Sequence, residues 1–362
     1  MTTIRPRRRE IGIALIGAGK IGTHRARLAA QHPAVGFIAI ADVDGGAAER
    51  LADEVTADMW STDSTAVVTR PEVDAVIVST HEEAHAGPVL TALRAGKPTL
   101  VEKPLALRLD EADTMLAAAA ENHVELLVAY SMRYARRYAV AHDQLADKRI
   151  GDVLGGLARV YDTLAIGEAI LGRSPTATPA LDILTYLVDL IGWYHPARPV
   201  EVVARSHGTI LRSRGHDVDD LTFALVTYED GAVFDLSTSF SLPAGYPING
   251  SMVRLEILGS DGALFVTEDH GDQIMYSGAG YDNAYVNQHL NLAFLGSRTS
   301  GDWAGGTMFG RVADETRSWL DHLSAGGPCH ITTAAEARRT LEVTLAIDEA
   351  ARTGRRIRLE GS

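Results

Sequence analysis

The feature that most constrains this chain is a glycine-rich turn near its start, placed between an apolar run and a helical stretch. The apolar run spans Ile11–Ile16 and the helical stretch spans Thr23–Gln31. The turn fits the pattern G-x-G-x-x-G and consists of Gly17, Ala18, Gly19, Lys20, Ile21 and Gly22. In this context the first glycine permits a tight turn, the second lets the backbone approach a pyrophosphate, and the third lets helix and strand pack closely. The turn therefore predicts a dinucleotide site, with the pyrophosphate at the helix N-terminus, where N–H groups and the helix dipole favour negative charge.

The first third of the chain alternates between short apolar runs and helical stretches. The apolar runs are nearly continuous, which is typical of parallel strands buried on both faces. They span Ile11–Ile16, Val35–Ala41, Asp74–Ser79, Thr99–Val101 and Val124–Ala129. One of the intervening helices is expected over Asp110–Asn122, with Asp110 as its N-cap. This alternation predicts a doubly wound parallel sheet, an α/β Rossmann domain, over residues 11–135.

The end of the second expected strand indicates which dinucleotide binds. Asp42 directly follows Val35–Ala41. A carboxylate there can accept hydrogen bonds from the adenosine ribose and repels a 2′-phosphate, so NAD is favoured over NADP. Ligands of such sheets bind outside the carboxyl ends of the strands. We therefore expect Thr80, His81 and His85, in the loop after the third strand, to border the cofactor.

The same loop contains the zinc-protease pattern H-E-x-x-H, formed by His81 and His85 with Glu82 and Glu83 between them. That chemistry needs both histidines on one face of a continuous helix. Here His81 follows a strand, and Pro88 suits the first turn of a helix that begins after the pattern. The sequence therefore predicts no metal site.

After about residue 150 the pattern changes to apolar runs joined by tight turns. These runs are Val200–Arg205, Leu221–Tyr228, Ala232–Ser239, Val253–Leu258 and Ala263–Thr267. They predict a large, mostly antiparallel open sheet. The last helix has a capping box, Thr333 with Glu336, and is expected to end at Gly354. We assign residues 136–362 to a C-terminal α+β domain for substrate binding and oligomerisation. Residues 281–307 show little periodicity and fit either a loop over the pocket or an oligomer contact.

Two positions carry polar groups suited to redox chemistry. Glu102-Lys103-Pro104 follows a parallel strand, so Lys103 is expected to point toward the ligand crevice. In the apolar helix 181–191, Asp182, Tyr186 and Asp189 share one face, which looks either to solvent or to a cavity. Oxidation of a secondary alcohol needs a base for the hydroxyl proton. A neighbouring ammonium lowers the pKa of a phenol, so Lys103 and Tyr186 could form the base while Asp182 orients substrate hydroxyls.

Composition excludes several classes of partner. The net charge of −13 argues against nucleic acid and anionic membranes, which attract basic surfaces. The only cysteine, Cys329, permits no internal disulfide, and a reducing cytoplasm is expected. The arginines at positions 5 and 7–9 faintly resemble a twin-arginine export signal, but the following run is short and lacks a cleavage site. We therefore expect a disordered basic tail over residues 1–10.

Taken together, these residues resemble the Gfo/Idh/MocA oxidoreductases. The resemblance rests on the turn Gly17–Gly22, on Asp42, on Glu102-Lys103-Pro104 and on the helix with Asp182. It covers nearly the whole chain. It implies NAD(P)-dependent redox chemistry at a hydroxyl or ketone of sugars, inositols and related compounds. It places the cofactor against the glycine turn, Glu102 and Lys103, makes Lys103 the family's lysine and Asp182 its substrate-binding aspartate, and implies a homodimer or homotetramer.

The chain departs from the commoner helix pattern D-x-G-x-H-x-x-D, because Leu184 replaces the glycine and Tyr186 the histidine. Tyrosine occurs there in branches that resemble glucose–fructose oxidoreductase, dihydrodiol dehydrogenase and sugar ketoreductases, which weakens an inositol dehydrogenase assignment. The leading hypothesis is an NAD-dependent dehydrogenase or ketoreductase for a sugar, polyol or related cyclic compound. Two alternatives remain open: an NAD-dependent glycosidase with an internal redox cycle, and a non-catalytic NAD-binding regulator.

Overall fold

The computed structural model describes residues 9–243, 246, 251–268, 273–282, 289–295 and 302–359. The predicted basic tail lies almost wholly outside the described residues. The chain divides into two compact units. The first unit contains Met1–Tyr134 and Ser300–Leu341, and the second contains Ala135–Thr299 and Glu342–Ser362.

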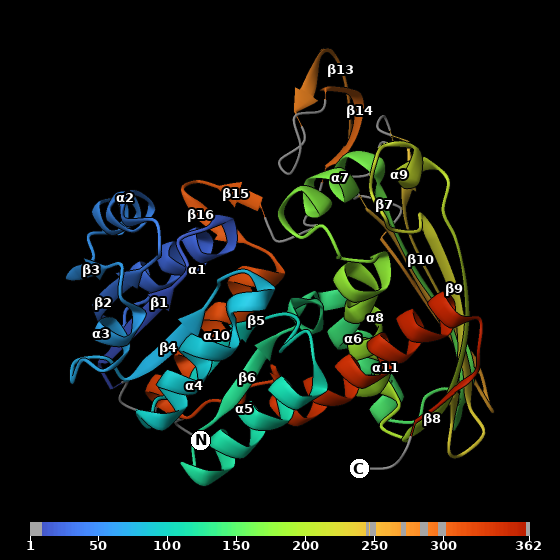
Figure 1. Ribbon diagram of the computed structural model, residues 1–362, viewed down its shortest axis with the longest axis horizontal. Coiled ribbons are helices and arrows are strands. Elements are labelled where there is room, and N and C mark those ends of the chain that lie inside the picture. The colour runs from blue at the N-terminus through green and yellow to red at the C-terminus, as the bar shows by residue number, and fades with distance from the viewer. Residues whose placement is uncertain are drawn as a thin grey trace, which may run out of the picture. The chain divides into compact units, whose positions relative to one another are not determined.

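The first unit is built on the predicted parallel sheet (Figure 1). Its strands are β1 (Ile11–Ile16), β2 (Val35–Ala41), β3 (Met59–Ser61), β4 (Ala75–Val78), β5 (Thr99–Glu102), β6 (Leu126–Ala129) and β17 (Thr332–Thr333). They are ordered β17-β6-β5-β4-β1-β2-β3, and only β17 runs antiparallel to its neighbour. The parallel strands thus have the order 3-2-1-4-5-6 of a Rossmann sheet, whose order reverses between β1 and β4.

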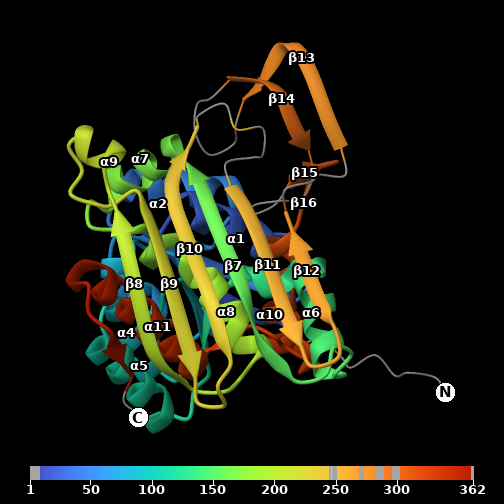
Figure 2. The same ribbon diagram turned by 90° about the vertical axis from the view of Figure 1, so that its right-hand side faces the viewer.

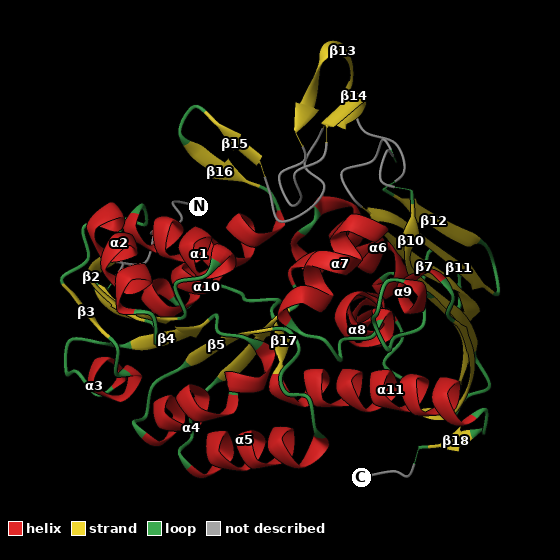
Figure 3. Cartoon of the chain, turned by 45° about the horizontal axis from the view of Figure 1, so that its top comes forward, coloured by secondary structure: helices red, strands yellow, loops and turns green. Residues whose placement is uncertain are grey.

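Helices cover both faces of this sheet (Figure 3). They are α1 (Lys20–Ala30), α2 (Gly45–Val55), α3 (Ser64–Val68), α4 (Ala86–Arg94), α5 (Leu109–Glu121) and α10 (Arg311–Ala325). All six residues of β1 are buried, as are all four of β4, which explains their continuous apolar sequence. Trp319 and Leu320 of α10 belong to the same core as Ile13 and Leu15.

Two predictions for this part of the chain need correction. The described part of 300–341 packs with the first unit, so assigning everything after residue 135 to the second domain is wrong. This segment also holds a short hairpin, β15 (Asp302–Ala304) and β16 (Thr307–Phe309). Asp110 is not an N-cap, because α5 is capped by Arg108 and begins at Leu109. Asp110 lies in the first turn, where it pairs with Arg108.

The second unit is built on the predicted open sheet. Its strands are β7 (Val153–Thr163), β8 (Pro199–His207), β9 (Leu221–Tyr228), β10 (Val233–Leu242), β11 (Ser251–Gly259), β12 (Ala263–Thr267) and β18 (Ile357–Arg358). Their order is β12-β11-β7-β10-β9-β8-β18. Every neighbouring pair is antiparallel except β7 and β10. A separate hairpin pairs β13 (Gln273–Asp282) with β14 (His289–Leu295), so part of the segment 281–307 is strand.

Helices pack on one face of this second sheet. They include α6 (Arg136–Ala146), α7 (Leu164–Arg173) and α8 (Thr185–Tyr194), which contact β12, β10 and β7. A one-turn helix, α9 (Ile210–Ser213), follows β8. Figure 2 looks onto the opposite face, where the strands lie in front. Helix α11 (Ala334–Thr353) has the predicted capping box, with the Thr333 N–H bonded to Glu336 and the Glu336 N–H to Thr333, and it ends before Gly354 as predicted.

Candidate functional site

The glycine turn has the geometry that its sequence predicts. Gly17 has a φ of +102°, and a Cβ there would lie 2.5 Å from the Ser79 carbonyl oxygen. A Cβ on Gly22 would lie 1.9 Å from the Gly17 carbonyl oxygen. These two glycines therefore hold α1 tightly against β1 and β4. Gly19 differs, because a Cβ there would meet nothing within 4 Å. The backbone is thus open at the one glycine that a pyrophosphate is expected to approach.

The start of α1 is suited to an anion. Gly19 is the N-cap, no side chain caps the helix, and the first turn has no acidic residue. Ser79 Oγ, at the end of β4, is buried without a hydrogen-bond partner among the described residues. Uncapped N–H groups and the positive end of the helix dipole favour a phosphate. The residues present therefore fit the dinucleotide that the sequence predicts.

Asp42 sits at the end of β2 and is bonded to the glycine turn. Its Oδ2 accepts a hydrogen bond of 2.6 Å from the Ala18 N–H, and its Oδ1 accepts one of 2.9 Å from the Asp44 N–H. Each carboxylate oxygen has a second lone pair. The structure thus gives Asp42 a role in fixing the turn, and leaves acceptor capacity for ribose hydroxyls.

The loop after β4 separates its two histidines. His81 is exposed and precedes a single 3-10 turn, Glu82–Ala84. His85 is 1% exposed; its Nδ1 lies 2.9 Å from the Pro104 carbonyl oxygen and its Nε2 3.3 Å from that of Thr80. Burial lowers the pKa of His85, so the neutral form, donating from Nδ1, is favoured. The bond from Nδ1 to the Pro104 carbonyl therefore ties the loop after β4 to the loop after β5, and contact of His85 with the cofactor stays a prediction. The two histidines share no helical face.

The loop after β5 is held by a buried arginine that the sequence analysis did not identify. Glu102 ends β5 and immediately precedes Lys103, whose peptide bond to Pro104 is cis. The Arg25 side chain, 1% exposed on α1, donates from Nε to Glu102 Oε1 at 2.6 Å. A signal was present in the sequence: Arg25 lies three residues after Gly22 and four before Ala29, so it shares their buried helical face.

In the second unit, two of the three residues of the predicted polar stripe are buried. Asp182 is 7% exposed and Asp189 is 1% exposed, which excludes a stripe that faces solvent. Tyr186, on α8, is partly exposed. Asp182 lies in a π-helical turn, Ala180–Leu184, that leads into α8, and π turns inside helices occur frequently at functional sites. Asp182 Oδ1 lies 3.6 Å from Nη2 of Arg173, at the end of α7.

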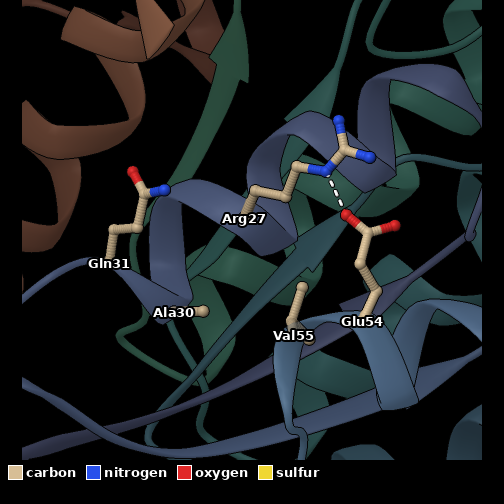
Figure 4. Close-up of a pocket in the computed structure, with 5 residues that line it drawn as sticks. All are labelled: Arg27, Ala30, Gln31, Glu54 and Val55. Carbon is tan, nitrogen blue, oxygen red and sulfur yellow. Dashed lines mark hydrogen bonds and ion pairs between the residues drawn. The ribbon is translucent and has the colours of Figure 1, made fainter. Parts of the chain in front are cut away.

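A pocket in the first unit lies away from these residues. It is lined by Arg27, Ala30, Gln31, Glu54 and Val55, from the C-terminal ends of α1 and α2 (Figure 4). An Arg27–Glu54 ion pair spans it. Because the N-terminus of α1 is the anion-binding end, this pocket is not the dinucleotide site. Over the described residues, no cluster of His, Cys, Asp or Glu could hold a metal ion, and no helix is long and apolar enough to cross a membrane.

A Rossmann sheet, an open glycine turn and an acidic residue at the end of β2 together define a protein of the dinucleotide-binding class. Comparison with known families agrees. The Gfo/Idh/MocA oxidoreductase family, NAD-binding Rossmann fold, matches residues 11–130, and its C-terminal domain matches residues 138–265. The chain belongs to this family of oxidoreductases.

Named relatives act on cyclic polyols and sugar derivatives. A Bacillus subtilis scyllo-inositol 2-dehydrogenase (NAD(+)) is 28% identical over 71% of this chain and 74% of its own length. A 1,5-anhydro-D-fructose reductase of Ensifer adhaerens is 32% identical over 50% of this chain and 56% of its own length. Among solved structures, GenD2 from gentamicin A biosynthesis, in complex with NAD, has a TM-score of 0.80 at 22% identity, covering 98% of this chain and 97% of its own. That likeness shows a shared fold.

Proposed function

We propose that this protein is an NAD-dependent dehydrogenase or ketoreductase that acts on a secondary alcohol or ketone of a cyclic polyol or sugar. The observation that carries the proposal is the conjunction of an open glycine turn at Gly19 with a lysine that directly follows Glu102, the end of β5 and the partner of buried Arg25. The relatives named above support the substrate class. They include both inositol and anhydrosugar enzymes, so the choice between these is left to experiment.

The proposed roles follow from the chemistry of each side chain. Bound NAD supplies the hydride acceptor or donor. Lys103, as an ammonium, would stabilise a phenolate, and Tyr186 in that form would take the hydroxyl proton of the alcohol. Asp182 would accept hydrogen bonds from substrate hydroxyls and so orient the ring. In the reductive direction Tyr186 would return the proton to the new alkoxide.

The first experiment measures nicotinamide reduction with NAD and, separately, NADP against inositols, sugars and cyclic diols. Lys103→Ala is expected to abolish turnover while the dissociation constant for NAD stays within a few-fold. Lys148→Ala is the control, because Lys148 is exposed and pairs with the exposed Asp152 on the surface. If Lys103→Ala turns over normally, the proposed role is wrong. Tyr186→Phe and the double variant test coupling: two residues that act on one step lose much less together than the sum of their separate losses.

The alternatives make different predictions in the same assay. A glycosidase with an internal redox cycle would retain its cofactor and release no net NADH. A regulator would bind NAD without any turnover. NAD reduction with one class of cyclic alcohol excludes both.

We further propose that a second copy of this chain covers the outer face of the open sheet. That face carries exposed apolar side chains on the neighbouring strands β8 and β9, where Val203 is paired with Leu225 and Phe223 lies two residues along β9. Phe265, on the edge strand β12, is 68% exposed. Contiguous apolar surface of this kind is typical of an association site. Rows of opposite charge cross the same face: Arg159 is paired with Arg254, and Glu256 in the adjacent row lies opposite Leu157. A self-complementary two-fold contact could place one row against the other.

The oligomer is tested by the molar mass in solution. Phe265→Glu is expected to convert a dimer or tetramer to smaller species in light scattering. Val43→Glu is the control, because Val43 is 94% exposed and belongs to the first unit, not to this sheet. A monomeric wild-type protein would contradict the proposal.

A further inference from the structure

A largely buried charge cluster in the first unit connects the helix of the glycine turn with the residue before Lys103. Its centre is the guanidinium of Arg25, on α1. Arg25 donates to Glu102 Oε1 at 2.6 Å from Nε, to Glu315 Oε2 at 2.7 Å from Nη2, and to Thr316 Oγ1 at 2.8 Å from Nη1. Glu315 and Thr316 lie on α10 and are 0% exposed. Helix α1, strand β5 and helix α10 are distant in the sequence and thus meet at one planar guanidinium group.

The Arg25 guanidinium bonds two carboxylates, those of Glu102 and Glu315, and Arg311 also attracts Glu315. Glu315 Oε1 is buried without a hydrogen-bond partner among the described residues. Burial raises the pKa of Glu315 to about 7 despite the attraction of Arg25. An ion cluster of this kind is a poor source of stability, since apolar residues of similar volume usually serve as well or better. The presence of this ion cluster in the core therefore calls for an explanation other than stability.

The geometry supplies one. An arginine bound on several of its nitrogens has a fixed orientation, because its donors form a rigid fork. Glu315 and Thr316 hold two of those nitrogens, which leaves Nε aimed at Glu102. Glu102 in turn is the last residue of β5, paired in the sheet with Ala129, and Lys103 follows it directly.

We propose that Glu315 is a positioning residue for the reaction: it fixes Arg25, and Arg25 fixes Glu102 and thereby the backbone that carries Lys103. This proposal rests on the catalytic role of Lys103 proposed above. It assigns α10, which lies more than 200 residues beyond Lys103 in the sequence, to the support of the active site. A misplacement of about 1 Å at a catalytic group can cost on the order of a hundredfold in rate, so a loosened cluster should be visible in kcat.

Two variants separate geometry from charge. Glu315→Gln keeps the shape and removes one charge. Arg25→Lys keeps the positive charge and removes the rigid, planar set of guanidinium donors. Both are expected to lower kcat by about tenfold or more while the dissociation constant for NAD changes by less than about threefold. Glu54→Gln is the matched control. It breaks the ion pair between Glu54 and Arg27, which lies on α1 as Arg25 does, but at a more exposed position. It should behave as the wild type.

A purely structural cluster would give a different result. The melting temperature would fall while kcat stayed within about twofold of the wild type in both variants, and that outcome would overturn the proposal. If Glu315→Gln does not fold, Thr316→Val provides the test, because it removes the neutral acceptor of Nη1 and, besides that, only the hydroxyl's hydrogen bond to the Val312 carbonyl within α10. It is expected to lower kcat by a few-fold, and unchanged kcat would count against the proposal.

A second readout does not depend on the substrate. The chain has four lysines, and trace acetylation followed by mass spectrometry reports the reactivity of Lys103 against exposed Lys148 as an internal reference. The pH dependence of Lys103 labelling is expected to change in Glu315→Gln and Arg25→Lys, and to be unchanged in Glu54→Gln. If none of the tested substrates supports NAD reduction by the wild type, the proposed function fails. Labelling of Lys103 still decides this inference in that case. An unaltered Lys103 profile in both variants would refute it.

Discussion

Replacing Gly19 with alanine should separate cofactor binding from folding. The N-cap backbone at Gly19 has φ −71° and ψ −172°, which any residue adopts, and a Cβ there meets nothing within 4 Å. The protein alone should therefore lose less than about 1 kcal/mol of unfolding free energy, the usual difference between glycine and alanine at an N-cap. The added methyl group would occupy the space into which a pyrophosphate must come.

The effect on NAD can be estimated from the contacts that would be lost. A hydrogen bond from a backbone N–H to a charged group contributes about 1.5–3 kcal/mol. Loss of one such bond raises the dissociation constant by roughly 10- to 100-fold. The assay is calorimetric titration with NAD, together with thermal melting in the absence of cofactor.

Two further glycine substitutions complete the test. Gly22→Ala would place a Cβ 1.9 Å from the Gly17 carbonyl oxygen, so it should cost about 1–3 kcal/mol in stability even without NAD. Gly87→Ala, near the start of α4, adds a Cβ in open space and should change neither property. If Gly19→Ala binds NAD within about twofold of the wild type, or melts as early as Gly22→Ala, the interpretation of the turn is refuted.

Other predictions concern charge. Asp42→Asn keeps an acceptor for the Ala18 N–H but removes the repulsion of a 2′-phosphate, so the preference for NAD over NADP in kcat/KM should narrow by about tenfold or more; an unchanged ratio would exclude Asp42 as the selector. Because the pKa of Glu315 is raised from 4.5 to about 7, the native state binds a proton that the unfolded chain releases, and stability should fall as pH rises through this window. Urea unfolding at both ends of the window should show this fall in the wild type and less of it in Glu315→Gln; equal falls would contradict the assignment. Burial lowers the pKa of His85 below 6.5, so the unfolded chain binds a proton that the native state does not. The contribution of His85 to the free energy of unfolding is therefore lost as the pH falls below that value. His85→Gln should flatten the acid limb of the same stability curve, and an unaltered limb would count against a buried neutral imidazole.

Local patterns in the sequence were enough to predict much of the first unit. The strand Val35–Ala41 is found with the predicted bounds, and Gly17 and Gly22 make the tight turn and the close helix contact that their positions predict. In the second unit, Leu221–Tyr228 and Ala263–Thr267 were likewise predicted to the residue. Each of these signals lies within a few residues of the feature it predicts, because strand periodicity and turn geometry are local properties.

The missed arginine cluster depends on contacts between distant parts of the chain. Arg25 meets Glu315 across 290 positions, and no periodicity in either helix indicates that pairing. The wrong N-cap at Asp110 has a local cause: Arg108 pairs with it and the helix starts one residue earlier. His85 is expected at the cofactor because of its loop; in the structure its Nδ1 donates to the Pro104 carbonyl of the next loop, a contact between separate parts of the chain that the local pattern does not indicate.

The discontinuity of the first unit has a consequence for how the protein is made. Synthesis proceeds at about 5–20 residues per second, so the ribosome completes Tyr134 roughly ten to forty seconds before α10 has been made. During that interval the nascent sheet lacks Trp319 and Leu320, and Arg25 has no Glu315 to meet. We expect the nascent first unit to remain open and dependent on chaperones until the last fifth of the chain emerges. Fragments that end near Tyr134 should accordingly be recovered as aggregates rather than as an isolated nucleotide-binding domain.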